Sequence, residues 1–368
     1  MAKTKQEERI LLSVVDVEKK YAVDPAETVN ASSGIVSWGK ENDLPKLLST
    51  CYDRSATLKA AIDQSVNYVD GDEVVVTDAA AVWKERINRR NQDMDTLVAH
   101  LTMDYYVYGN FCCQVVFNSL GIPCEIFPLD VSKCRLNERM DKVYYSKKGW
   151  TKYQTKSDEY DRFGYADFDP ENPTQIYFYN GTGVRRFYNP APWAAAMDDV
   201  LTEIEGSRYS LNSVTNGFSA RYLINLPDTA NLTDEQKQAV IDGIKTHFTG
   251  SDAPSNFMVY WGNDESKSLT VNKIESNEDP ENFQTIRNGA RENIFTSLRI
   301  SSLLCGLGNS QTGFSTQEYS DAYKLFDRTV AAPIRKVIQD SINDIIGVED
   351  GVVIVPFTIN FNNDGKNE

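Results

Sequence analysis

One stretch of the sequence could bind a phosphate. Gly34, Gly39 and Lys40 have the spacing of the first part of a phosphate-binding loop, in which backbone amides and a lysine hold the phosphates of a nucleotide. Such a loop also needs a serine or threonine after the lysine, to bind magnesium, and an apolar strand before the first glycine. Here Glu41 follows the lysine, and residues 30–33 are Asn-Ala-Ser-Ser. We therefore expect no nucleotide site.

Side chains for acid–base chemistry are equally scarce. The two histidines, His100 and His247, fall on predicted amphipathic helices, without a serine or cysteine motif that a catalytic histidine would serve. Adjacent aspartates at 198–199 are typical of a solvated helix start. The acidic residues 158–159 lack the regular ligand spacing of a calcium-binding loop. The sequence thus predicts no enzyme, no catalytic residue and no cofactor.

The cysteines argue against metal binding and disulfides. No two of the six have the Cys-x-x-Cys spacing of a zinc site, so we expect reduced and mostly buried thiols. These are Cys51, Cys112, Cys113, Cys124, Cys134 and Cys305. The sequence also contains no apolar run long enough to cross a membrane, and its polar N-terminus does not resemble a signal peptide. We expect the chain to stay in the cytoplasm where it is made, without membrane contact.

Length and charge restrict the functional class further. The chain has 368 residues, enough for two or three domains, and its 41% hydrophobic and 25% charged residues are ordinary for a globular protein. Its net charge of -15 is unsuited to tight nucleic-acid binding, because that requires lysine and arginine to displace counterions from phosphates. The charge does not exclude a protein past which DNA slides.

The first half of the chain predicts a mixed α/β region after an N-terminal arm. Apolar spacing indicates one helix over 44–68, another over 80–91, and a third that begins near Asp93 and ends before Gly109. Short apolar runs indicate strands, and we expect the segment between residues 145 and 175 to be an irregular loop. The expected strands are 74–76, 111–117, 123–128, 142–145 and 175–179.

The second half predicts long helices around a small module. Helices over 194–218 and 279–301 carry apolar stripes that need a buried partner, so we expect the two to pack together. Between them lies a strand–helix–strand pattern, with Thr233 opening the helix through a capping box. A loop rich in small residues follows, and a second capping box at Ser315 opens a helix that Pro333 should kink. Residues 352–361 are expected to form a final strand.

Four segments, in this order, resemble portal proteins of tailed bacteriophages. Residues 38–45 (Trp-Gly-Lys-Glu-Asn-Asp-Leu-Pro) match an aromatic-Gly-Lys-x-Asn-x-Leu-Pro pattern, and residues 283–306 resemble a helix that runs into two leucines and a glycine. Ser301 and Ser302 stand where that pattern has prolines. Residues 312–318 resemble the Phe-Ser start of a long helix, and 332–345 resemble its proline-containing continuation. The resemblance covers most of residues 35–346.

The resemblance implies an α+β portal fold with a mixed α/β wing, two stem helices, a small α/β clip and a long C-terminal helix. The expected parts are an N-terminal arm (1–34), the wing (35–193), stem helix 1 (194–218), the clip (219–276), stem helix 2 (277–301), a tunnel loop (302–314), and a long helix with a C-terminal strand and a reduced crown (315–368).

The resemblance also implies a function and partners. A portal is a homo-oligomeric ring, usually a dodecamer, at one capsid vertex of the virion, where double-stranded DNA passes during packaging and ejection. Its expected partners are the terminase large subunit, the major capsid protein and a neck or adaptor protein. The alternative is another structural head–tail connector without enzymatic activity. On this interpretation Asn309, Ser310, Gln311 and Thr312 face the DNA channel. The clip contacts its partners through Asp252, Asn256, Asn263 and Asp264.

Overall fold

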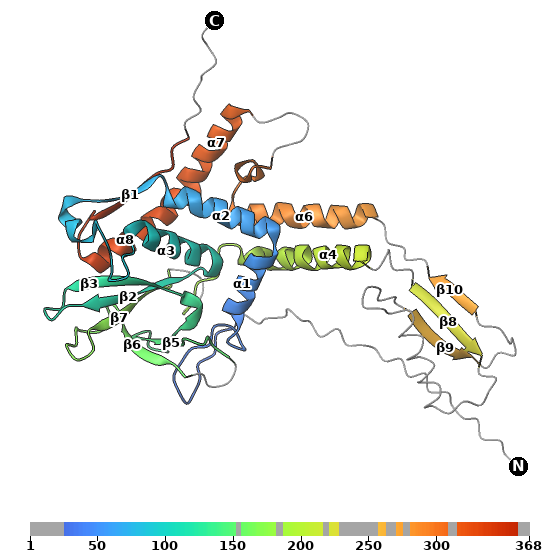
Figure 1. Cartoon of the computed structure of the whole chain (residues 1–368), viewed down its shortest axis with the longest axis horizontal. Coiled ribbons are helices and arrows are strands. Elements are labelled where there is room, and N and C mark those ends of the chain that lie inside the picture. The colour runs from blue at the N-terminus through green and yellow to red at the C-terminus, as the bar shows by residue number, and fades with distance from the viewer. Residues whose placement is uncertain are drawn as a thin grey trace, which may run out of the picture.

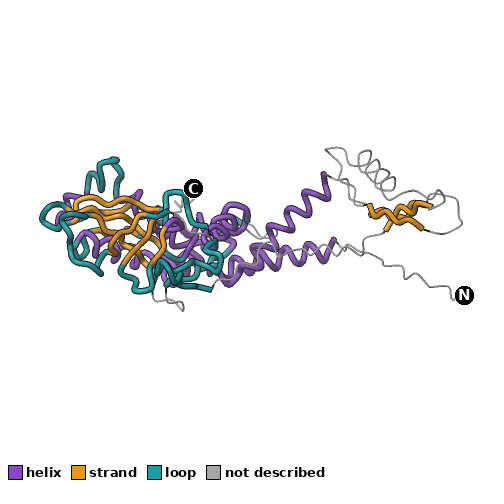
Figure 2. The backbone as a smooth tube through the Cα atoms, turned by 90° about the horizontal axis from the view of Figure 1, so that it is seen from below, coloured by secondary structure: helices purple, strands orange, loops and turns teal. Residues whose placement is uncertain are grey.

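The protein is an elongated α+β molecule with three parts in line (Figures 1 and 2). The computed structural model describes residues 26–151, 156–181, 187–215, 221–227, 257–262, 270–274, 280–307 and 315–359. A large body of helices and sheet carries two long helices side by side, and a small sheet lies beyond their far ends. The expected α+β class is confirmed.

The body is built on a six-stranded sheet. Its strand order is β3-β2-β7-β6-β5-β4, and all neighbours are antiparallel except β6 and β7. The strands are β2 (Phe111–Phe117), β3 (Pro123–Leu129), β4 (Cys134–Leu136), β5 (Lys142–Tyr145), β6 (Asp158–Arg162) and β7 (Thr174–Tyr179).

Strand β6 corrects the expectation of an irregular loop between residues 145 and 175. Its sequence, Asp-Glu-Tyr-Asp-Arg, has no apolar alternation that would indicate a strand. It is instead paired through its backbone with β5 and β7, and the Lys142 ammonium of β5 lies 3.4 Å from Glu159 and 2.5 Å from Asp161. Such pairing depends on the partner strand, which spacing within the segment does not reveal.

The helices of the body begin with α1 (Leu44–Arg54) and α2 (Ala56–Asp70). The sequence predicted one helix here, and that prediction is wrong at Ser55. The backbone of this residue is extended (φ -90°, ψ 113°), and its hydroxyl accepts a hydrogen bond from Leu58 N at 3.1 Å. Serine therefore acts as an N-cap in the middle of a continuous apolar pattern.

Helix α3 (Met94–Tyr108) confirms its predicted start and end. Asp93 accepts a hydrogen bond from Thr96 N at 2.9 Å, and Gly109 ends the helix in a left-handed conformation (φ 77°). The helix predicted over 80–91 is wrong, since only a short 3-10 turn forms, at Asp78–Trp83. Further along the chain, the carbonyl oxygen of Ile87 accepts a hydrogen bond from Ile126 N in β3, and the side-chain amide of Asn88 donates to the carbonyl oxygen of Ile126. These bonds replace helical hydrogen bonds.

The C-terminal part consists of α7 (Thr316–Phe326), a π-helical turn (Asp327–Ala331), α8 (Ala332–Ile346) and β11 (Val352–Val355). The π turn lies directly before Pro333, which cannot donate a helical hydrogen bond, so the predicted irregularity is confirmed. Ser315 stands at the N-cap of α7, but its side chain makes no capping hydrogen bond, contrary to the predicted capping box. The last strand is shorter than predicted and pairs with β1 (Glu73–Val76).

The segment 38–45, part of the portal resemblance, is a packing junction. The Trp38 ring stacks on Tyr188 with 4.5 Å between ring centroids. The buried Arg135 guanidinium lies 5.6 Å from the Trp38 ring and donates to both the side chain and the carbonyl of Asn42. Gly39 and Lys40 lie in a turn, which Asn42 N closes on the Gly39 carbonyl oxygen, and α1 starts only at Leu44, so Lys40 does not stand at a helix N-terminus as in a phosphate-binding loop.

A half-buried carboxylate at the end of α2 makes stability depend on pH. Burial raises the pKa of Asp70 from 3.8 to about 6, and one of its oxygens has no hydrogen-bond partner among the described residues. Because the folded-state pKa is raised, Asp70 does not lower the stability below pH 4, and its destabilising effect grows as pH rises through 6. We expect Asp70→Asn to stabilise the protein at pH 8 by up to about 3 kcal/mol, and to lose this advantage below pH 4.

Urea unfolding at several pH values tests this expectation. The control is Asp53→Asn, a change of the same kind at an exposed position of α1. A gain at pH 8 that is equal for both variants, or independent of pH, contradicts the assignment to Asp70.

Candidate functional site at the stem

The two long helices that leave the body are α4 (Met197–Thr215) and α6 (Pro280–Leu298). They lie side by side (Figure 1), and the amide of Asn293 donates to the Asp199 carboxylate at 3.0 Å. The residues buried near the body recur at helical spacing: Val200 and Ile204 on α4, with Ala290, Ile294 and Leu298 on α6. The predicted packing of the two helices is confirmed. Of the predicted stripes, Met197 and Leu201 are only partly buried.

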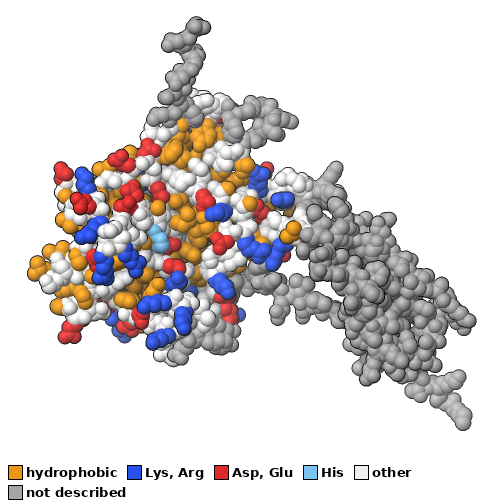
Figure 3. Space-filling view, in the orientation of Figure 1, with side chains coloured by type: hydrophobic (Ala, Val, Ile, Leu, Met, Phe, Trp, Pro, Cys, Tyr) orange, Lys and Arg blue, Asp and Glu red, His pale blue; other side chains and the backbone are white. Residues whose placement is uncertain are grey.

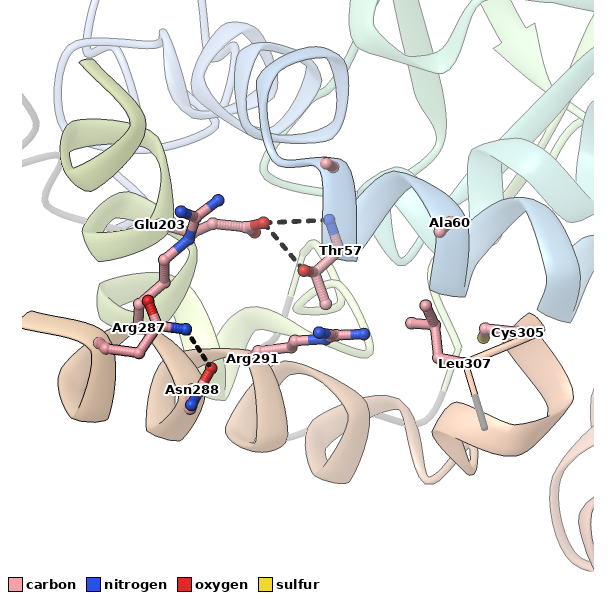
Figure 4. Close-up of a pocket in the computed structure, with 10 residues that line it drawn as sticks. Thr57, Ala60, Glu203, Arg287, Asn288, Arg291, Cys305 and Leu307 are labelled. Atoms are coloured by element: carbon pink, nitrogen blue, oxygen red, sulfur yellow. Dashed lines mark hydrogen bonds between the residues drawn. The ribbon is translucent and has the colours of Figure 1, made fainter. Parts of the chain in front are cut away.

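Glu203 fastens this pair of helices to the body. Its carboxylate is buried and accepts hydrogen bonds from the Ser55 hydroxyl and from the amide and hydroxyl of Thr57, at 3.3 and 2.8 Å (Figure 4). These groups lie at the start of α2, where free backbone amides favour a negative charge. An acidic side chain of α4 thus completes the N-terminal cap of a helix in the body.

An open pocket of about 370 Å³ lies beside this junction. Figure 4 shows α6 on one side of it and the start of α2 on another. Two arginines of α6, Arg287 and Arg291, line it, and neither has a carboxylate partner among the residues that the structure describes. The apolar lining includes Ala56, Ala60 and Leu307. The buried Glu203 also lines the pocket, which therefore combines two arginines, one carboxylate and a small apolar surface.

The sequence did not point to Glu203, Arg287 or Arg291. Each belongs to an amphipathic helix with other charged residues, and spacing alone does not distinguish a buried carboxylate from a solvated one. A glutamate on the buried side of α4, one residue before Ile204, was the available signal.

The predicted tunnel-loop and clip residues lie outside the described part of the chain. This applies to Asn309, Ser310, Gln311 and Thr312, and equally to Asp252, Asn256, Asn263 and Asp264. The structure describes the flanks of the loop, where a 3-10 turn (Ser302–Cys305) ends at Gly306 in a left-handed conformation (φ 77°).

Three strands of the predicted clip are described. They are β8 (Arg221–Pro227), β9 (Phe257–Gly262) and β10 (Thr270–Ile274), in the order β10-β8-β9. Strand β8 runs parallel to β9 and antiparallel to β10. They form the small sheet beyond the stem helices (Figure 2), and the helix predicted from Thr233 lies outside the described residues.

The two histidines were the first candidates for acid–base chemistry. His100 lies with its Nε2 atom 3.1 Å from the Leu129 carbonyl oxygen and 3.6 Å from the Asp104 carboxylate, whose pKa is raised by burial. His247 is not among the described residues. Within the described ranges, no group of three His, Cys, Asp or Glu side chains could hold a metal ion, and no helix is long and apolar enough to span a membrane.

Several solved structures share this fold. A chain from the neck of an empty GTA particle, computed with C6 symmetry, superposes with a TM-score of 0.56 at 15% identity, covering 90% of this chain and 86% of the other. A chain from the neck of the native GTA particle, computed with C12 symmetry, gives 0.53 at 14%, covering 90% and 86%. An HK97-family phage portal protein from Corynebacterium diphtheriae gives 0.52 at 11%, covering 80% and 88%.

The sequence itself places the chain in a family. No curated protein matches it. The family model for phage portal proteins, however, matches residues 51–365, which include most of the body, both stem helices and the small sheet beyond their far ends. Phage portal proteins are structural proteins. The order of elements, the paired stem helices and this match lead to one conclusion: the chain belongs to the phage portal protein family.

Proposed function

We propose that this portal protein assembles into a closed ring at one capsid vertex, around a channel through which double-stranded DNA enters and leaves the virion. The observation that carries the proposal is the arrangement of the molecule, in which two paired helices separate a broad body from a small sheet (Figure 2). Such a stem allows copies to stand side by side around an axis, with body and small sheet at opposite ends.

The similar structures support the ring. Two of them are chains in the neck of a particle, computed with C6 and C12 symmetry. Rotational symmetry requires that one side of a subunit fit the opposite side of the next, and repetition of this contact closes the ring. We infer a homo-oligomeric ring, taken as a dodecamer, which is located in the virion and assembles in the host cytoplasm.

The charge of the chain suits a passage better than a binding site. At -15 per copy, the assembled protein repels phosphates on average, so DNA can slide without being held. On the face shown in Figure 3, acidic and basic side chains are interspersed, with no uniformly basic surface. Asn309 to Thr312 would line the channel with neutral polar groups, which contact phosphates without binding them as lysine does.

The remaining partners follow from the same proposal. The small sheet and its loops, with Asp252, Asn256, Asn263 and Asp264, would dock the terminase large subunit and later the neck or adaptor protein. The body would contact the major capsid protein. The energy for packaging would come from the terminase.

Electron microscopy of the purified full-length chain tests the ring. We expect particles with rotational symmetry and an axial hole wide enough for a DNA duplex, with the small sheets gathered at one end. A protein that stays monomeric at micromolar concentration, or that forms rings without an axial opening, would refute the proposal.

A further inference from the structure

The two long sides of the stem differ in charge. One side contains the pocket with Arg287 and Arg291 beside Ala56, Ala60 and Leu307. Glu203 lines the same pocket, but its carboxylate is bound by Ser55 and Thr57 and forms no ion pair with either guanidinium, so the two arginines leave the pocket with an excess of positive charge.

The other side of the stem carries two exposed carboxylates, those of Asp198 and Glu205. On α4, Asp198, Thr202, Glu205 and Tyr209 recur at intervals of three or four residues and are all exposed, so they form one stripe. Glu205 follows the buried Ile204 by one position and therefore points about 100° away from it around the helix. Its carboxylate lies 2.7 Å from Arg208 of the same helix, an exposed pair of the kind that contributes little stability.

Arg287 and Glu205 lie at the same level along the stem. The contact between Asn293 and Asp199 fixes how the two antiparallel helices are aligned. Arg287 lies six residues from Asn293 along α6, and Glu205 lies six residues from Asp199 along α4. Both steps lead away from the body. At 1.5 Å per residue, both residues lie about 9 Å from the contact.

In a ring, residues at the same height along the stem can meet between neighbouring copies. Rotation about an axis that runs along the stem leaves every residue at its own height and turns one side of a copy toward the opposite side of the next. We propose that the acidic stripe of one copy docks against the arginine pocket of its neighbour, with Glu205 facing Arg287. The pocket is open enough to admit a side chain, and closure around the pair would exclude water and strengthen the attraction.

This inference rests on the proposed ring and adds the residues that hold neighbouring copies together. It also explains why each copy carries both an acidic stripe and an arginine pocket. In a head-to-tail contact the two surfaces are different, so complementary charge on opposite sides favours association, whereas like charge on both would oppose it.

Charge reversal tests the contact. We expect Arg287→Glu and Glu205→Arg each to lower the ratio of rings to monomers at a fixed protein concentration at least about tenfold, because each change places like charges together at every contact of the ring. The double variant with both changes should restore rings, because the charges again match in the reversed sense. Ring and monomer fractions are measured by mass photometry, and circular dichroism of each variant reports its folding.

Lys336→Glu is the matched control, since it reverses an exposed charge on α8 whose only ion pair among the described residues is with Asp340. It should leave the ring fraction unchanged. If both single variants form the same fraction of rings as the wild-type chain, the proposed contact is overturned, although the ring itself stands. The same conclusion follows if the double variant forms no larger fraction of rings than the single variants. A wild-type chain that forms no ring would overturn the proposed function and this inference together.

Discussion

Arg335→Met should lower the free energy of unfolding by about 3 kcal/mol or more, which is the largest effect of a single substitution that we expect in the body. The Arg335 guanidinium is buried and donates to the carbonyl oxygens of Tyr68 and Val69, at 2.8 and 3.2 Å, in the last turn of α2. It also lies 2.8 Å from the Asp327 carboxylate in the π turn. Methionine fills similar space but leaves a carboxylate and two carbonyl groups without their partner.

The neighbouring residue provides the control for this prediction. Lys336 also pairs with an aspartate, Asp340, at 3.0 Å, but its side chain is 74% exposed. Lys336→Met should therefore change the free energy by about 0.5 kcal/mol or less. Urea unfolding followed by tryptophan fluorescence measures both variants, and similar losses for the two would show that Arg335 does not join α2 to α8 as described.

Arg135→Met should destabilise the body by about 2–4 kcal/mol, because several buried acceptors lose their donor at once. The guanidinium donates to the carbonyl oxygens of Ser132 and Cys134 at 2.8 and 2.7 Å, and to both oxygens of Asn42. No carboxylate among the described residues pairs with it, and burial lowers its pKa to about 10. Removal of a buried charge recovers part of the loss, so the expected effect is smaller than for Arg335.

A second variant separates geometry from charge at this position. Arg135→Lys keeps the positive charge but loses the planar group that lies between Trp38 and Trp150, 5.6 and 5.3 Å from their rings. We expect it to be nearly as destabilising as methionine, since lysine cannot reproduce the fork of donors. Arg139→Met, an exposed position close in sequence, is the control and should be neutral. If the lysine variant is as stable as the wild type, charge alone accounts for the role of Arg135.

Much of the fold could be predicted from local patterns. The apolar stripes of α4 and α6 predicted that the two helices pack together, because an amphipathic helix needs a partner for its apolar side. Asp93 and Gly109 predicted both ends of α3, because a cap or a left-handed glycine acts within a few residues. The four segments that resemble portal proteins, in their order along the chain, pointed to the family before any packing was known.

The errors share a cause. Strand β6 and the break at Ser55 depend on partners far away in the sequence: Lys142 for the strand, and Glu203, whose carboxylate meets the Ser55 hydroxyl, for the break. The helix expected over 80–91 does not form, because Ile87 and Asn88 make hydrogen bonds with Ile126 instead. In each case a tertiary contact supplied hydrogen bonds or ion pairs that local propensity did not include.

The sequence by itself determined the class of protein, the stem and the order of the parts, because periodicity, caps and turn residues act over short distances along the chain. Only the tertiary structure decided which charged residues matter. Glu203 caps a helix of the body, Arg335 joins α2 to α8, and Arg287 lines a pocket, although all three look like ordinary surface residues of amphipathic helices. The free energy of a charge depends on its burial and on the groups around it, and the fold brings those groups together from distant positions.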